Sequence, residues 1–139
     1  MSSPIINEVE TLSAGQDPMG LAIHNFFYKK EPHPLMVHSS LFDDDEIPVS
    51  HLFRTSSQCS AIEKCAIKEA RGRILDVGAG SGALSLALQE QGKEVKSIDM
   101  SHLSVDVMKQ RGVKDAECIN FYDSQLQGPF DTILFLMNG

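Results

Sequence analysis

The chain has 139 residues, of which 42% are apolar, and a formal net charge of −7. This size fits one ordinary domain with a core of its own, and the composition excludes an intrinsically disordered chain. The negative charge disfavours a nucleic-acid partner, because phosphate contacts require Lys and Arg. The acidic run at residues 43–46 is expected to be a solvated loop.

Three cysteines, Cys59, Cys65 and Cys118, match no metal-ligand spacing, so no bound metal is expected. No apolar run is long enough to span a membrane, and the first residues lack the features of a signal peptide. We therefore expect reduced thiols, a cytoplasmic location and no membrane association.

Residues 1–56 are expected to form an N-terminal helical or irregular segment. Asp17-Pro18 is a typical N-cap and first-turn pair, and it predicts a helix over about 18–29. Two prolines predict extended or turning backbone within 31–40. A short helical or irregular piece is expected around 48–54.

Residues 57–139 alternate regularly between helix and strand patterns. Ser57 and Ser60 are both candidate N-caps of a helix that Gly72 ends. Its predicted buried face holds Ala61, Ile62, Cys65, Ala66 and Ala70. Strands are then predicted at 73–77, 94–99, 115–120 and 130–137. One helix is predicted at 81–91, and a second helix begins after its cap Ser101 and ends at residue 111. Alternation with short loops predicts an α/β fold with a Rossmann-like, doubly wound parallel sheet.

The segment at residues 74–88, ILDVGAGSGALSLAL, reads as a buried strand, a glycine turn and a helix. Gly78, Gly80 and Gly82 form G-x-G-x-G, which permits a tight turn and a close approach of ligand to backbone. Asp99 closes the next strand, 19 residues after Gly80. A carboxylate there can accept hydrogen bonds from both hydroxyls of a ribose. These features fit NAD and other adenosyl ligands equally well.

Asp76 separates the two kinds of ligand. It lies two residues before Gly78, where a negative charge disfavours a pyrophosphate and favours a cationic ligand without phosphate. S-adenosylmethionine, with its sulfonium and amino groups, is such a ligand. The residues thus favour an aminoacyl-nucleoside in this turn.

The same residues carry a family resemblance. The stretch ILDVGAGSG, with Asp99 at its distance, resembles motif I of the class I S-adenosylmethionine-dependent methyltransferases. AECINFYD and FDTILFLMNG resemble their third-strand and fourth-strand segments, so the resemblance covers about residue 72 to the end. It implies S-adenosylmethionine as the cofactor and methyl transfer to an unidentified small-molecule or other acceptor.

The family has a seven-stranded sheet in the order 3-2-1-4-5-7-6, whereas four strands are predicted here. The resemblance therefore implies a methyltransferase truncated after its fourth strand, which lacks much of the substrate-binding half. An open apolar strand edge invites pairing with another chain. We expect a homodimer through the edge of the strand at 130–137.

The resemblance also implies roles for individual residues. Those expected to bind the cofactor are Asp76, Gly78, Ala79, Gly80 and Gly82 at the methionine end, Asp99 at the ribose, and Met100, Asn120 and Phe121 at the adenine. Met100 and Phe121 are equally open to a core-packing interpretation. Asn138 is the only candidate for a role near the transferring methyl group, and a turn residue is the alternative.

Other interpretations stay open at this point. A nicotinamide-dependent oxidoreductase shares the glycine turn and Asp99, and Asp76 is the feature against it. A non-catalytic interaction module that keeps the cofactor site is a third possibility. Arg54 either reaches the carboxylate of the ligand or is a surface residue, and His102 is expected at the surface.

Overall fold

A computed structural model describes residues 11–30, 35–37 and 45–136 of the chain. Its centre is a parallel sheet of four strands: β3 (Arg73–Val77), β4 (Glu94–Asp99), β5 (Ala116–Cys118) and β6 (Thr132–Leu134). The strands lie in the order β5-β4-β3-β6, which is the order 3-2-1-4 expected for the first four strands of the family. The predicted Rossmann-like α/β fold is therefore confirmed.

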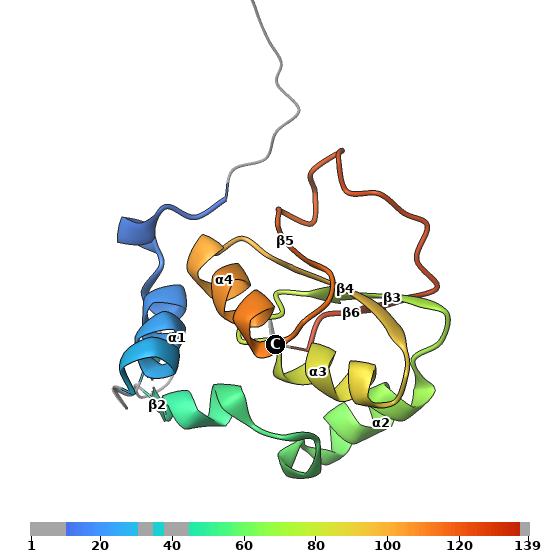
Figure 1. Cartoon of the computed structure of the whole chain (residues 1–139), viewed down its shortest axis with the longest axis horizontal. Helices are drawn as coiled ribbons and strands as arrows, with labels where there is room; N and C mark the ends of the chain where they lie inside the picture. Colours follow the sequence, from blue (N-terminus) through green and yellow to red (C-terminus); the bar gives the residue numbers. More distant parts are fainter. Residues whose placement is uncertain (1–10, 31–34, 38–44, 137–139) are drawn as a thin grey trace, which may run out of the picture.

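Helices cover one face of this sheet (Figure 1). Helices α2 (Ala61–Glu69) and α3 (Ala83–Glu90) pack there through a cluster that includes Ile67, Leu88, Ile74 and Val95. Helix α4 (His102–Arg111) packs beside α3, where Val105 and Met108 meet Ala116 of β5. Gly112 ends α4 in the left-handed conformation, as its position in the sequence predicted.

The opposite face of the sheet is covered differently. Leu75, Val77 and Ile98 contact the segment after β5, through partly buried side chains such as Phe121 and Phe130. This segment runs from the end of β5 to β6 and leaves the carboxyl ends of β3 and β4 accessible to a ligand.

The N-terminal part packs against α4. Helix α1 (Pro18–Lys29) begins after the Asp17 cap, as predicted, and lies beside α4 in Figure 1. Ile23 of α1, Leu52 and Val107 form a buried cluster between them. Three 3-10 turns flank these elements: η1 (Ala14–Gln16), η2 (Val49–Phe53) and η3 (Ser56–Gln58).

A short antiparallel pair was not predicted. Strand β1 (Leu35–Val37) pairs with β2 (Asp45–Ile47). The pairing places residues 45 and 46 of the acidic run in a strand, where the sequence predicted a loop, and residues 43 and 44 lie outside the described residues. Within the described part of the chain, no helix combines the length and apolar character needed to cross a membrane.

The predicted buried face of α2 is largely wrong. Ile67 and Ala70 are buried, whereas Ile62 is 73% exposed. The helix is rotated because Glu63 points inward, where its carboxylate pairs with Arg54. The side chains of Arg54 and Glu63 are only 6% and 12% exposed, so the second of the two interpretations of Arg54, a surface residue, is wrong. Ser60, rather than Ser57, caps the helix.

The Arg54–Glu63 pair yields a stability prediction. Burial alone would raise the pKa of Glu63. Hydrogen bonds from Arg54 and Ser60 outweigh this effect and lower the pKa to about 2. Its folded-state pKa is thus depressed, so its stabilisation is present above about pH 4.5 and lost as the pH falls toward 2. We expect Glu63→Gln to lower the free energy of unfolding by roughly 3 kcal/mol at neutral pH, because it removes a buried countercharge.

Urea unfolding of the wild type and the variant measures this loss. Glu69→Gln is the matched control on the same helix, because the Glu69 carboxylate is 61% exposed and meets Arg71 only at 3.9 Å. If both variants unfold at the wild-type midpoint, the pair does not stabilise the fold.

Candidate functional site

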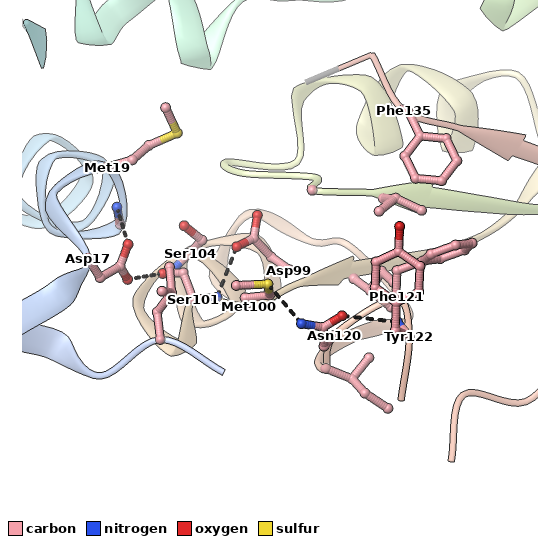
Figure 2. A pocket seen from close by; sticks show the side chains of 16 residues that line it. Asp17, Met19, Asp99, Met100, Ser101, Ser104, Asn120, Phe121, Tyr122 and Phe135 are labelled. Carbon is pink, nitrogen blue, oxygen red and sulfur yellow. Dashed lines mark hydrogen bonds between the residues drawn. The ribbon is translucent and has the colours of Figure 1, made fainter. Parts of the chain in front are cut away.

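A pocket of about 410 Å³ lies at the carboxyl ends of β3 and β4. This edge is where open α/β sheets bind ligands, and the volume is within the usual range for small-molecule sites. Figure 2 shows side chains that reach it from several elements. The residues that line it are Leu12, Asp17, Met19, Gly20, Val77, Gly78, Ile98, Asp99, Met100, Ser101, Ser104, Ile119, Asn120, Phe121, Tyr122 and Phe135.

The glycine turn forms the end of the pocket nearest β3. Gly78, Gly80 and Gly82 have φ angles of 67°, 60° and 86°, in the left-handed region that favours glycine. A Cβ atom at Gly82 would also lie 2.8 Å from Val113 and 3.0 Å from Met108. The three glycines are therefore required by the backbone path of the turn itself.

The turn residues differ in their exposure to the pocket. Gly78 lines it, whereas Ala79, Gly80 and Gly82 are buried and are not among its lining residues. Ala79 packs in the cluster beneath α4. These three positions shape the turn from behind, and Gly78 carries the backbone that faces the pocket.

Asp99 holds the turn against the end of β4. Its Oδ2 accepts a hydrogen bond from the N–H of Gly80 at 2.9 Å, and its Oδ1 accepts one from the N–H of Ser101 at 2.9 Å. Burial raises the pKa of Asp99, the two N–H groups oppose that rise, and the nearby charge of Asp17 adds to it. A carboxylate has about four acceptor positions, so Asp99 can still accept two hydrogen bonds from a ligand.

Asp76 lies beneath the turn and is completely buried. Its Oδ2 accepts the hydroxyl proton of Ser85 at 2.7 Å, and Ser97 lies 2.6 Å from that hydroxyl. Because Ser85 has one hydroxyl proton, Ser97 is the donor to Ser85. Within the described residues, Oδ1 of Asp76 has no hydrogen-bond partner.

This burial changes the charge assumed for Asp76. Burial raises its pKa to about 7, with Ser85 and Arg54 acting against the rise and the charge of Asp99 adding to it. At neutral pH the carboxyl group is thus only partly ionised. The side chain is not turned into solvent, but it is not among the pocket-lining residues either.

The far end of the pocket is apolar and aromatic. Met100, Asn120 and Phe121 all line it, as Figure 2 shows. The side-chain amide of Asn120 donates to the sulfur of Met100 at 3.3 Å and accepts from the N–H of Tyr122 at 3.0 Å. Phe121 contacts the ring of Phe135 edge-on at 5.1 Å and also packs on the sheet. Core packing and pocket lining are therefore compatible for Phe121.

The remaining candidate site residues either do not line the pocket or lie outside the described residues. Arg54 is not among the lining residues, and its guanidinium holds Glu63. His102 is exposed, as expected. Asn138 lies outside the described residues. No group of three or more His, Cys, Asp or Glu that could hold a metal ion occurs among the residues the structure describes.

Sequence reasoning missed the contribution of the N-terminal segment. Leu12, Asp17, Met19 and Gly20 line the same pocket as Asp99, although they precede it by some eighty residues. One signal was available, because a glycine in the first turns of an otherwise regular helix often marks a close approach.

Comparisons with known proteins agree with this geometry. Residues 75–136 match the family model for a methyltransferase domain. A solved S-adenosylmethionine-dependent methyltransferase from Bacteroides fragilis, in complex with S-adenosyl-L-homocysteine, is 55% identical to this chain. The two align with a TM-score of 0.87 over 94% of this chain and 54% of that chain.

Two curated relatives match a shorter part. An uncharacterized methyltransferase from Staphylococcus carnosus is 37% identical over 65 residues, which are 47% of this chain and 31% of that protein. A cypemycin N-terminal methyltransferase from a Streptomyces species is 35% identical over 68 residues, 47% of this chain and 28% of that protein. The matches thus span about a third of the length of the curated relatives.

The fold and the site define a class I methyltransferase architecture: a parallel sheet in the 3-2-1-4 order, a glycine turn after its first strand and an acid after its second. The resemblance predicted from ILDVGAGSG and Asp99 is confirmed by the matching family model and by the solved S-adenosylmethionine-dependent methyltransferase that is 55% identical over 94% of this chain.

The buried carboxyl group yields a pH prediction. Because the folded-state pKa of Asp76 is raised from 3.8 to about 7, the fold becomes less stable as the pH rises between those values. Asn does not titrate and can still accept the Ser85 hydroxyl. We expect the stability of Asp76→Asn relative to wild type to grow by up to about 1.4 kcal/mol per pH unit across this range.

Urea unfolding at several pH values from 4 to 8 measures the difference. Asp115→Asn is the control, because the Asp115 side chain is 52% exposed on the sheet edge. A difference between Asp76→Asn and wild type that stays constant over this range would show that Asp76 is ionised throughout.

Proposed function

We propose that this chain binds S-adenosylmethionine and serves methyl transfer to a small-molecule acceptor. One observation carries the proposal: the pocket bounded by Gly78 and Asp99 lies in a chain that is 55% identical, over 94% of its length, to a protein solved with S-adenosyl-L-homocysteine. The acceptor is unidentified, and the net charge of −7 disfavours a nucleic acid.

The residues present fit this cofactor. Asp99 retains acceptor capacity for the two ribose hydroxyls, and such charge-assisted hydrogen bonds are strong. Met100 and Phe121 offer apolar surface to the purine, and Asn120 lies between them with its amide. An acid is common at the position of Asn120 in the family, so this chain replaces a charged acceptor there with a neutral amide.

The glycine turn after β3 would hold the methionine end of the cofactor. We assign it to the backbone around Gly78, supported from behind by Ala79, Gly80 and Gly82, with Asp76 beneath. Asp76 keeps one carboxylate oxygen that no described residue satisfies by a hydrogen bond. A buried unsatisfied oxygen costs free energy that a nearby positive charge or donor offsets.

Methyl transfer from a sulfonium to an acceptor that is already nucleophilic requires no acid or base catalysis by the protein. When bound, this cofactor would supply an electrophilic methyl group, with its sulfonium as the leaving group that would keep the carbon–sulfur electron pair. The residues of this chain hold the reacting groups in line and exclude water.

Two lesser proposals accompany this function. Cys59, Cys65 and Cys118 are free thiols, which supports a reducing compartment such as the cytoplasm. Residues 57–139 would form the cofactor-binding half-domain, with residues 1–56 as an N-terminal segment.

Calorimetric titration tests the cofactor assignment. We expect the 139-residue chain to bind S-adenosylhomocysteine and not NAD. Asp99→Ala should weaken this binding by about 2 kcal/mol, or roughly thirtyfold in Kd, because it removes charge-assisted hydrogen bonds. Glu90→Ala is the control for loss of one negative charge, since Glu90 is exposed at the end of α3.

The outcomes separate the alternatives. Binding of NAD alone would favour the oxidoreductase. Binding of S-adenosylhomocysteine without methyl transfer to any acceptor would favour the non-catalytic module. Unchanged affinity in Asp99→Ala would remove Asp99 from the site.

We also propose that the edge of β6 pairs with a second copy of the chain. Strand β6 is bonded to β3 on one side and ends the four-stranded sheet on the other. Ile133 on β6 is 43% exposed and Phe135 beyond it is 48% exposed. Apolar edge strands with unpaired backbone groups favour such association.

Light scattering after size-exclusion chromatography measures the mass. We expect a dimer for the wild type and a monomer for Ile133→Lys, because a lysine on an edge strand opposes pairing. Ile62→Lys on α2 is the matched control, since Ile62 is 73% exposed on another surface. A wild-type monomer at high concentration would contradict the proposal.

A further inference from the structure

The N-terminal segment from Leu12 to Gly20 supplies one wall of the cofactor pocket. This segment lies outside residues 75–136, which match the methyltransferase family model. Figure 2 shows Asp17 and Met19 on one side of the pocket, Phe121 and Phe135 on the other, and Asp99 between them. The wall is therefore built from residues that the family match does not include.

The backbone joins this segment to the residues that follow Asp99. The N–H of Leu12 donates to the carbonyl of Met100 at 2.8 Å, and Leu12 forms a parallel bridge with Ser101. These contacts hold the segment next to the end of the pocket that Asp99 lines.

Asp17 makes the central side-chain contact. It is 3% exposed, its Oδ1 accepts the N–H of Gly20 at 2.9 Å, and its Oδ2 accepts the hydroxyl proton of Ser101. The same Ser101 hydroxyl accepts the N–H of Ser104 at 3.0 Å and so caps α4. One carboxylate thus joins the first turns of α1 and α4.

Ser101 connects Asp17 to Asp99 by hydrogen bonds. Its backbone N–H donates to Oδ1 of Asp99 at 2.9 Å, while its hydroxyl is held by Asp17. Asp17, Ser101 and Asp99 therefore form a continuous hydrogen-bonded series from α1 to the acid at the end of β4.

Gly20 shows how close this junction is. A Cβ atom at this position would overlap the Asp17 carboxylate and the Ser101 hydroxyl, nearer than real Cβ atoms approach. Glycine costs about 1 kcal/mol relative to alanine within a helix, and here the close approach of α1 to Ser101 explains its presence.

We propose that Asp17 is a positioning residue of the cofactor site, which fixes Ser101 and through it the orientation of Asp99 toward the ribose. This proposal rests on the proposed function. It assigns the segment at residues 12–20 to the site itself, beyond its role as a helix start.

Asp17→Asn separates positioning from capping. Asn is as good an N-cap as Asp, so it can still accept the N–H of Gly20. Its amide has one oxygen, however, so it cannot accept the Ser101 hydroxyl at the same time in the same geometry. We expect near-wild-type thermal stability and an S-adenosylhomocysteine Kd at least fivefold higher, measured by calorimetry on the 139-residue chain.

Two further variants sharpen the test. Ser60→Ala removes the N-cap of α2, away from the pocket, and should lower thermal stability while leaving the Kd at the wild-type value. Because Asp17 acts through Ser101, Asp17→Asn combined with Ser101→Ala should bind no more weakly than Ser101→Ala alone. A purely structural effect of Asp17 would instead add to that of Ser101→Ala.

The outcomes are distinct. If the wild type binds S-adenosylhomocysteine and Asp17→Asn binds it equally well, the positioning role is wrong and the proposed function stands. Additive losses in the double variant also overturn the role. A wild-type chain that binds no S-adenosylhomocysteine would overturn the proposed function and this inference with it.

Discussion

The candidate site depends above all on the carboxylate of Asp99, which accepts the N–H groups of Gly80 and Ser101. The first bond fixes the glycine turn after β3, and the second fixes the start of α4. Two loops that follow neighbouring parallel strands are thereby joined by one side chain at the carboxyl edge of the sheet. Such a constraint orients the acid before any ligand binds, so less ordering remains to be done on binding.

The charge balance of this edge explains which ligand it suits. Asp17 and Asp76 are buried and Asp99 is half-buried, and burial raises the pKa of Asp76 and of Asp99. Arg54 lowers the pKa of Asp76, but its guanidinium also pairs with Glu63. The sequence predicted that Asp76 carries the discriminating charge, but Asp76 is buried beneath the turn and does not line the pocket. In the structure Asp99 and Asp17 are the two acids that line the pocket, and Asp17 adds a negative charge there that the sequence argument for a cationic ligand did not include.

Local patterns predicted much of the fold and less of the site. The caps Asp17 and Ser101 and the stop at Gly112 placed α1 and α4 at their observed ends, because capping is decided within a few residues. The inward turn of Glu63 and the burial of Arg54 could not be predicted, since an ion pair between an irregular segment and a helix leaves no periodic signal. The contact of Asp17 with Ser101 joins residues 84 apart in sequence, so it follows from tertiary packing alone.

That packing links the pocket to the docking of α1. Ile23, Leu52 and Val107 bury the contact between α1 and α4, and the same docking brings Asp17 to Ser101. A ligand that contacts both Asp99 and the wall formed by α1 therefore binds the docked arrangement in preference to any arrangement in which α1 has moved away. Thermodynamic linkage makes this effect reciprocal. The free energy that the docking of α1 adds to ligand binding equals the free energy by which the bound ligand stabilises that docking. The N-terminal segment and the sheet edge then act as one binding unit, although Asp17 and Ser101 are 84 residues apart in the sequence.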